Sequence, residues 1–181
     1  MTKARKAALI VICEDKQHKS FASRFLRSMG WDKHEIRIKQ CSLVKGAGEQ
    51  RVRELYAEEL KRYRKSHVNR ALVAIVDGDT FGVRERMRQF DRRCEELQIQ
   101  PRQKKEKVAI IVPTRSIETW IEYLEGNTVN ETVSYPKLQY ESDCQPSVDR
   151  LVEYCRSTGL PESAPESLRA ACDEYQERIL R

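Results

Sequence analysis

The chain has 181 residues, of which 39% are hydrophobic and 34% are charged, and its net charge is +6. This length suits one domain with a core of its own and leaves little room for a second full domain. Positive and negative charges are mixed along the chain, which argues against a disordered acidic or basic protein. The positive balance favours an anionic partner such as nucleic acid, and we expect no membrane partner.

Cysteine usage points to a reducing compartment. The six cysteines contain no Cys-x-x-Cys pair, which disfavours a zinc ribbon, and a secreted disulfide framework is disfavoured because we find no secretory signal. The apolar stretch near the N-terminus is short and predicts a first strand rather than a targeting sequence. We therefore expect free thiols in a cytoplasmic protein.

Four segments have the character of β-strands. The apolar runs 7–13, 71–76 and 108–112 each predict an interior strand of a parallel sheet. The segment 35–44 alternates between apolar and polar residues, and it predicts a more exposed strand at or near an edge.

The segments that follow these strands carry apolar residues at helical spacing. We expect helices around residues 21–29, 52–63 and 83–97, and a short helix over 117–124 with Ser116 as its N-cap. Strands that alternate with helices predict an α/β fold with a parallel, Rossmann-like sheet flanked by helices.

The C-terminal third has a different pattern. Periodicity fails over 127–145, which predicts a loop with room for a short strand, and 146–155 and 165–180 both have the start signals and spacing of helices. We expect residues 1–126 to form the α/β domain, and 127–181 to form a loop and a helical C-terminal extension that packs on it or on a partner.

Acidic residues follow three of the predicted strands. Glu14 follows the first, Asp77 and Asp79 follow the run ALVAIV, and Glu118 lies beyond the 108–112 strand. Parallel strands place these ends at one edge of the sheet, where α/β proteins bind ligands. Carboxylates gathered there repel one another, and Mg²⁺ or Mn²⁺ suits an oxygen-only cluster. The pattern therefore predicts a metal site.

Gly78 separates the two aspartates. We expect Asp77 and Asp79 to share a direction, and Gly78 to allow a close turn and the approach of a metal or phosphate. The alternative is that Asp77 begins an Asx-turn and Asp79 caps a helix that starts near Thr80. The three histidines have no metal-ligand spacing, and we expect surface or capping roles for His18, His34 and His67.

Glu14 after a strand, a following helix and the later Asp77-Gly-Asp79 resemble the Toprim domain of topoisomerases, bacterial primases, recombination proteins and OLD-family nucleases. The segment RSIETW is similar to an element of small stand-alone Toprim-like proteins found near phage-defence and restriction genes. The resemblance covers residues 7–125. It implies that Glu14 is a general acid or base or a metal ligand, that Asp77 and Asp79 hold Mg²⁺ or Mn²⁺, and that Glu118 is a further ligand.

A carboxylate-held metal beside a phosphate suits phosphodiester hydrolysis. The chain lacks room for the additional domains that a topoisomerase or primase needs, so the resemblance implies a small nuclease, the effector of a phage-defence or DNA-processing system. Asp15 stands where many Toprim proteins have glycine, and that part of the pattern departs from the family.

Two other functions remain open. The first is a non-catalytic nucleic-acid-binding adaptor for a partner ATPase, which would be another chain because this one contains no Walker A pattern. The second is a haloacid-dehalogenase-like phosphatase with Asp77 as nucleophile and Asp79 as general acid. That family needs a later strand that ends in paired acids, and none follows residue 112. The sequence also leaves open whether the chain forms a homo-oligomer.

Basic residues near the acidic motifs are candidates for phosphate contacts. Lys45 and Arg51 flank a glycine-containing turn that opens a helix, Arg84 and Arg88 lie four residues apart after the Asp-Gly-Asp motif, and Arg115 lies beside the proposed site. The alternative for each group is a solvated helix face balanced by nearby glutamates.

Overall fold

The computed structural model describes residues 8–41 and 48–181, so Lys45 lies outside the described residues. The strands are β1 (Ala8–Cys13), β2 (Ile36–Gln40), β3 (Arg70–Ile75) and β4 (Val108–Ile111). They form one parallel sheet in the order β2-β1-β3-β4. The prediction of an α/β fold with a parallel sheet is confirmed.

The register places the carboxyl ends of all four strands at the same level. Cys13 pairs with both Gln40 and Ile75, and Ile75 pairs with Ile111. The strand β2 lies at one edge, as predicted. The strand β4 lies at the other edge, although we expected an interior strand. Its residues are apolar because helices cover both of its faces, and this does not require a neighbouring strand on each side.

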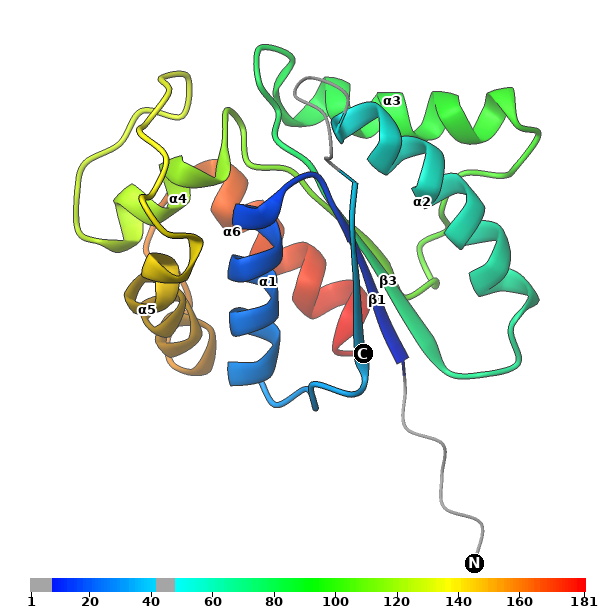
Figure 1. The fold of residues 1–181 in the computed structure, drawn as a ribbon, viewed down its shortest axis with the longest axis horizontal. Coiled ribbons are helices and arrows are strands. Elements are labelled where there is room, and N and C mark those ends of the chain that lie inside the picture. The colour runs from blue at the N-terminus through cyan, green and yellow to red at the C-terminus, as the bar shows by residue number, and fades with distance from the viewer. Residues whose placement is uncertain (1–7, 42–47) are drawn as a thin grey trace, which may run out of the picture.

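Two helices cover one face of the sheet. They are α2 (Gly48–Lys65) and α3 (Gly82–Glu96), which Figure 1 shows side by side on one side of the strands. Tyr56 of α2 and Phe90 of α3 meet edge to face, with ring centroids 4.9 Å apart, and both are buried.

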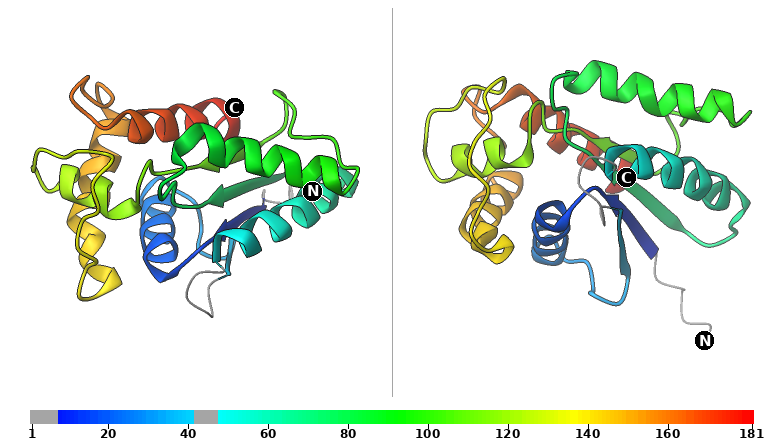
Figure 2. Two further views of the ribbon diagram at one scale, coloured as in Figure 1. Left: turned by 90° about the horizontal axis from the view of Figure 1, so that it is seen from above. Right: turned by 45° about the horizontal axis from the view of Figure 1, so that its top comes forward.

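The opposite face is covered by α1 (Lys16–Ser28) and by α6 (Glu166–Glu174), which continues into the π-helical turn η2 (Tyr175–Ile179). Figure 2 shows this last segment lying along the sheet, and it contacts β4. Tyr175 packs edge to face on Phe25 and accepts a hydrogen bond from Trp31 Nε1 at 2.9 Å. The end of the chain therefore supplies part of the hydrophobic core.

The remaining helices form a smaller cluster beside α1. They are α4 (Ile117–Leu124) and α5 (Gln145–Arg156), and the 3₁₀ turn η1 (Glu141–Cys144) precedes α5. Residues 127–140 contain no strand, so the loop prediction is confirmed there and the optional short strand is not formed. Glu131 in this loop accepts hydrogen bonds from the backbone N–H groups of Glu166 and Ser167, and so it ties the loop to the start of α6.

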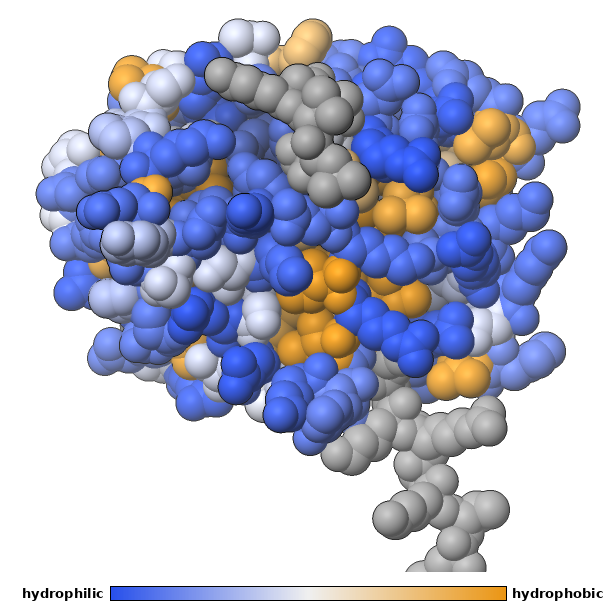
Figure 3. Space-filling view, viewed as in Figure 1, coloured by the Kyte–Doolittle hydropathy of each residue, from blue (hydrophilic) through white to orange (hydrophobic). Residues whose placement is uncertain are grey.

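The surface is mostly hydrophilic. Figure 3, viewed as Figure 1, shows hydrophobic residues gathered near the middle of the molecule, between α1 and α2 and beside β2. Of the helices within residues 8–41 and 48–181, none combines the length and apolar character that crossing a membrane requires.

We expect Tyr175→Ala to lower the free energy of unfolding by about 3 kcal/mol, because it removes a buried ring from the core and leaves Trp31 Nε1 without its acceptor. Urea denaturation followed by circular dichroism measures this change. The control is Leu180→Ala, five residues further along and half-exposed, which should change stability by less than about 0.5 kcal/mol. Equal effects of the two changes would contradict a core role for η2.

Candidate functional site

The strand order contains a topological switch point. From β1 the chain passes through α1 to β2 on one side, while β3 and β4 lie on the other side of β1. In open α/β sheets the crevice at the carboxyl ends of the two strands flanking such a point is the usual ligand site. Glu14 directly follows β1, and Asp77 comes two residues after β3, so both lie at the carboxyl ends of these two strands. Glu14 Oε2 accepts a hydrogen bond from the Asp77 backbone N–H at 3.3 Å.

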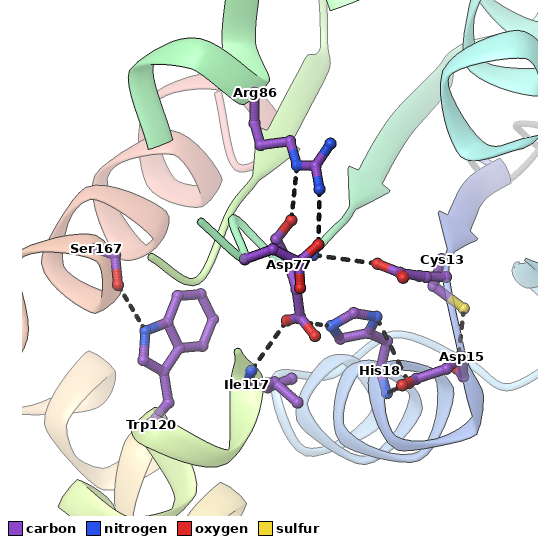
Figure 4. Close-up of polar contacts among 10 residues, drawn as sticks. Cys13, Asp15, His18, Asp77, Arg86, Ile117, Trp120 and Ser167 are labelled. Atoms are coloured by element: carbon purple, nitrogen blue, oxygen red, sulfur yellow. Dashed lines mark hydrogen bonds and ion pairs between the residues drawn. The ribbon is translucent and has the colours of Figure 1, made fainter. Parts of the chain in front are cut away.

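The Asp77 carboxylate is held by two other parts of the chain. Its Oδ1 accepts hydrogen bonds from His18 Nε2 at 2.9 Å and from the Ile117 backbone N–H at 3.0 Å. Figure 4 shows the carboxylate between His18 and Ile117. Ile117 is the first residue of α4, so Asp77 satisfies a free N–H at that helix start and places its charge at the positive end of the dipole. Ser116 occupies the predicted N-cap position, but its side chain makes no capping bond there.

His18 belongs to the site, although the sequence predicted a surface or capping role. It is fully buried on α1, and its Nδ1 lies 3.6 Å from Asp15 Oδ1. Burial alone would lower the pKa of His18, but the carboxylates of Asp77, Asp15 and Glu14 outweigh burial and raise the pKa to about 9. The imidazole is therefore protonated at neutral pH and partly balances the acidic residues around it.

A sequence signal for His18 existed. Phe21, Ala22 and Phe25 follow it at spacings of three, four and seven, so His18 lies on the apolar face of α1. This position predicts a buried histidine near the end of β1. Its contact with Asp77 depends in addition on β3 being the neighbour of β1.

The acidic residues disfavour one another's charge. Burial, together with the charge of Asp77, raises the pKa of Glu14 to about 7, against the opposing effect of His18. Glu118 is 4% exposed, and burial, with smaller effects from Asp77 and Asp15, raises its pKa as well. Two carboxyl groups here therefore hold protons more tightly than usual, and a cation at the same place would relieve the same repulsion.

Asp79 has a different partner from Asp77. Its Oδ2 lies 2.7 Å from Arg86 Nη2, and its backbone is in the left-handed region with φ +49°, which aspartate tolerates. The two carboxylates therefore do not share partners, because the chain leaves the strand geometry after Ile75 and turns at Gly78. The alternative that Asp79 caps a helix is wrong, since α3 begins at Gly82 with Phe81 at its N-cap.

Arg86 is the buried cation beneath this turn. It is 2% exposed, donates from Nε to the Asp77 carbonyl at 2.9 Å, and lies 3.1 Å from Glu49 Oε2. A buried guanidinium needs such partners, because an unpaired charge in the interior is costly. Arg86 therefore fixes the backbone of the Asp-Gly-Asp turn from below. The sequence analysis did not single out this arginine.

Gly78 is also required for a reason that the sequence did not indicate. A Cβ at this position would lie 2.1 Å from the Thr114 carbonyl oxygen, and the Gly78 N–H donates to the Pro113 carbonyl at 2.8 Å. The turn after β3 is thus pressed against the segment after β4. Glycine therefore allows the close approach of two backbones as well as the expected turn.

The predicted basic residues surround the site unevenly. Arg84 and Arg88 are exposed on α3, and Arg88 lies 3.9 Å from Glu85. Arg51 on α2 is exposed and pairs with Glu54 at 3.2 Å. Arg115 donates from Nε to Ser134 Oγ at 3.0 Å, and its carbonyl accepts the Asp79 N–H, so among these predicted residues it is the one tied most directly to the acidic turn.

The acidic side chains of the site do not form a complete set of metal ligands in the described residues. Within the part of the chain that the structure describes, no group of three or more His, Cys, Asp and Glu side chains is arranged to hold a metal ion. Glu14 and Asp77 meet, Glu118 is electrostatically coupled to Asp77, and Asp79 faces Arg86. All six cysteines are free thiols, as predicted.

Comparisons with protein-family models, with curated proteins and with solved structures found no match to this chain. The chemistry of the site is therefore argued from its residues and their geometry.

We expect Gly78→Ala to cost about 3 kcal/mol of stability or more, because the added methyl group meets backbone that cannot move aside easily. Gly30→Ala is the matched control: Gly30 also stands in a turn and has φ +104°, but no atom lies within 4 Å of the added carbon, so the cost should be about 1 to 2 kcal/mol. Thermal unfolding measures both. A Gly78 variant as stable as the Gly30 variant would disprove the close approach.

We expect Glu14→Gln to stabilise the protein at alkaline pH. The pKa of Glu14 is about 7 when folded and 4.5 when unfolded, so the unfolded state releases its proton first as pH rises. Glu14 therefore has no effect below pH 4.5, destabilises the fold progressively from there to about pH 7, and has its full effect above. The gain from Glu14→Gln should be about 1 to 3 kcal/mol at pH 8.

Urea denaturation at pH 4 and pH 8 tests this expectation. Glu95→Gln, an exposed glutamate of α3, is the control and should show no such pH dependence. A Glu14→Gln protein that is less stable than the parent at pH 8 would contradict the strain assigned to this carboxyl group.

Proposed function

We propose that this protein is a metal-dependent nuclease of the Toprim type, which hydrolyses phosphodiester bonds in nucleic acid. The observation that carries the proposal is the contact between Glu14 and Asp77 at the topological switch point of a parallel sheet. Two carboxyl groups in that place, one with its pKa raised to about 7, form a site that gains from a cation.

The residues present can supply part of the ligand set of Mg²⁺ or Mn²⁺, and the substrate would supply the rest. Mg²⁺ is commonly bound by one or two protein carboxylates, with waters and substrate phosphates as its other ligands, so a set of three protein ligands is not required. Glu14 and Asp77 would hold the ion, and Asp77 would do so through Oδ2, because two donors already engage Oδ1. A bound ion would polarise a phosphoryl oxygen and lower the pKa of a water. Glu118 and Asp79 are the further predicted ligands.

The chain's own residues supply the rest of the chemistry. A bound cation would lower the pKa of Glu14 from the value of about 7 that it has without one, so Glu14 would be ionised and could accept a proton from an attacking water. His18 and the Ile117 N–H hold the Asp77 carboxylate in one orientation, as supporting residues do around metal ligands. Arg84, Arg88 and Arg115 lie on the segments that follow β3 and β4, where they can contact the phosphates of a bound strand. Lys45 and Arg51 are the remaining predicted contacts.

The cellular role follows from the resemblance. We propose that the protein acts in the cytoplasm as the effector of a phage-defence or DNA-processing system, with an ATPase on a partner chain and with homo-oligomerisation as a further means of assembly. The free thiols of all six cysteines support the compartment.

A specific observation favours one alternative, the non-catalytic adaptor. His18 is paired with Asp77 and Arg86 with Asp79, so cations of the protein already balance both aspartates. An adaptor would keep this arrangement as structure and bind nucleic acid or an ATPase through its basic surface. The haloacid-dehalogenase-like phosphatase has less support, because Asp79 faces Arg86 rather than Asp77, and because no strand that ends in paired acids follows β4 in the described part of the chain.

The decisive test is cleavage of labelled single- and double-stranded DNA and RNA at increasing Mg²⁺ or Mn²⁺. We expect Asp77→Asn and Glu14→Gln each to lower the metal-dependent rate by at least about 100-fold while the fold is kept. Asp77→Asn retains an acceptor for Ile117, and Glu95→Gln is the control for loss of one surface charge. Cleavage unchanged in both site variants would refute the assignment. Tight, salt-sensitive binding by a parent protein that does not cleave would favour the adaptor.

A further inference from the structure

Phe81 is an exposed aromatic residue beside the candidate site. It comes two residues after Asp79, its backbone N–H donates to the Gly78 carbonyl at 2.9 Å, and its side chain is 55% exposed. It therefore belongs to the same turn as the acidic residues and yet points into solvent. The hydrolytic chemistry assigns it no part.

One face of the Phe81 ring is held by Arg86. The guanidinium carbon of Arg86 lies 4.9 Å from the ring centroid, a cation–π contact. Arg86 cannot follow a moving ring, because its nitrogens bond the Asp77 carbonyl, Asp79 and Gln89. The exposed area of Phe81 is therefore its other face and its edge. A ring held in this way loses little freedom when a flat partner stacks on it.

Exposed positive charge follows this ring along α3. Arg84, one turn further along α3, is exposed and takes part in no ion pair within the described residues, and Arg88 in the next turn is 65% exposed. An aromatic face beside guanidinium groups is the combination by which proteins bind single strands: bases stack on the ring and phosphates meet the cations.

We propose that Phe81 is a stacking platform for an unpaired base of single-stranded DNA or RNA, beside the phosphate bound at the Glu14–Asp77 site. In a duplex both faces of each internal base are covered by neighbouring pairs, so only an unpaired base can reach the ring. The inference rests on the proposed function and narrows its substrate to single strands, including loops and frayed ends.

The test measures binding of a fluorescein-labelled 12-nucleotide single strand and of the matching duplex, with Ca²⁺ in place of Mg²⁺ so that binding is separated from cleavage. We expect Phe81→Leu to weaken single-strand binding roughly 5- to 100-fold and to leave duplex binding unchanged within about twofold. Leucine keeps an apolar contact with Arg86 but has no ring face. Phe81→Trp should retain affinity, and stacked bases should quench its added fluorescence.

Leu97→Ala, at the exposed far end of α3, is the control and should bind both nucleic acids as the parent does. Single-strand affinity unchanged in Phe81→Leu, or a Phe81→Trp protein without quenching, overturns the stacking role while cleavage by the parent still supports the nuclease. A ring-dependent preference for single strands in a protein that does not cleave leaves the stacking role standing and removes the hydrolytic one. No binding of either oligonucleotide by the parent overturns the inference.

Discussion

The Asp77 carboxylate is the point at which the two halves of the fold meet. It follows β3, accepts a hydrogen bond from His18 on α1, and accepts another from the first N–H of α4. His18 and Ile117 lie 59 and 40 residues away from Asp77 in the chain, and the largely buried carboxylate keeps its charge because each of these two residues supplies a donor. This one side chain therefore links α1 and α4 to the end of β3.

A second buried charge fixes the neighbouring turn. Arg86 bonds the Asp77 carbonyl and the Asp79 carboxylate from below, while Gly78 packs against the Thr114 carbonyl from the side. The acidic residues of the proposed metal site are thus also structural partners of protein cations. One carboxylate can both bind a protein cation and ligate a metal ion, because its two oxygens carry several lone pairs. A hydrogen-bond donor on one oxygen also orients the other oxygen toward a metal. This double use also explains why substitutions that keep shape, such as Asp to Asn, are more informative at this site than truncation to alanine.

The last third of the chain is part of the same structure. Glu131, in the long loop after α4, accepts from Thr114 next to the acidic turn and from the start of α6, while Tyr175 and Ile179 complete the core under α1. Arg102 forms a two-pronged ion pair with Glu174 and so joins the approach to β4 to the end of α6. Through Thr114 and Arg102, these contacts join the C-terminal part of the chain to the segments on either side of β4.

The sequence by itself determined the features that local pattern encodes. Apolar runs and helical spacing identified the strands and helices, and the rule that parallel strands end at one edge was sufficient to bring Glu14 and Asp77 together. It did not reveal that β4 is an edge strand, that His18 contacts Asp77, or that Asp79 turns toward Arg86. Those depend on which strands are neighbours and on how one turn packs against another, and such contacts join residues far apart in the chain. Periodicity reports whether a residue is buried; only the tertiary structure decides against what it is buried.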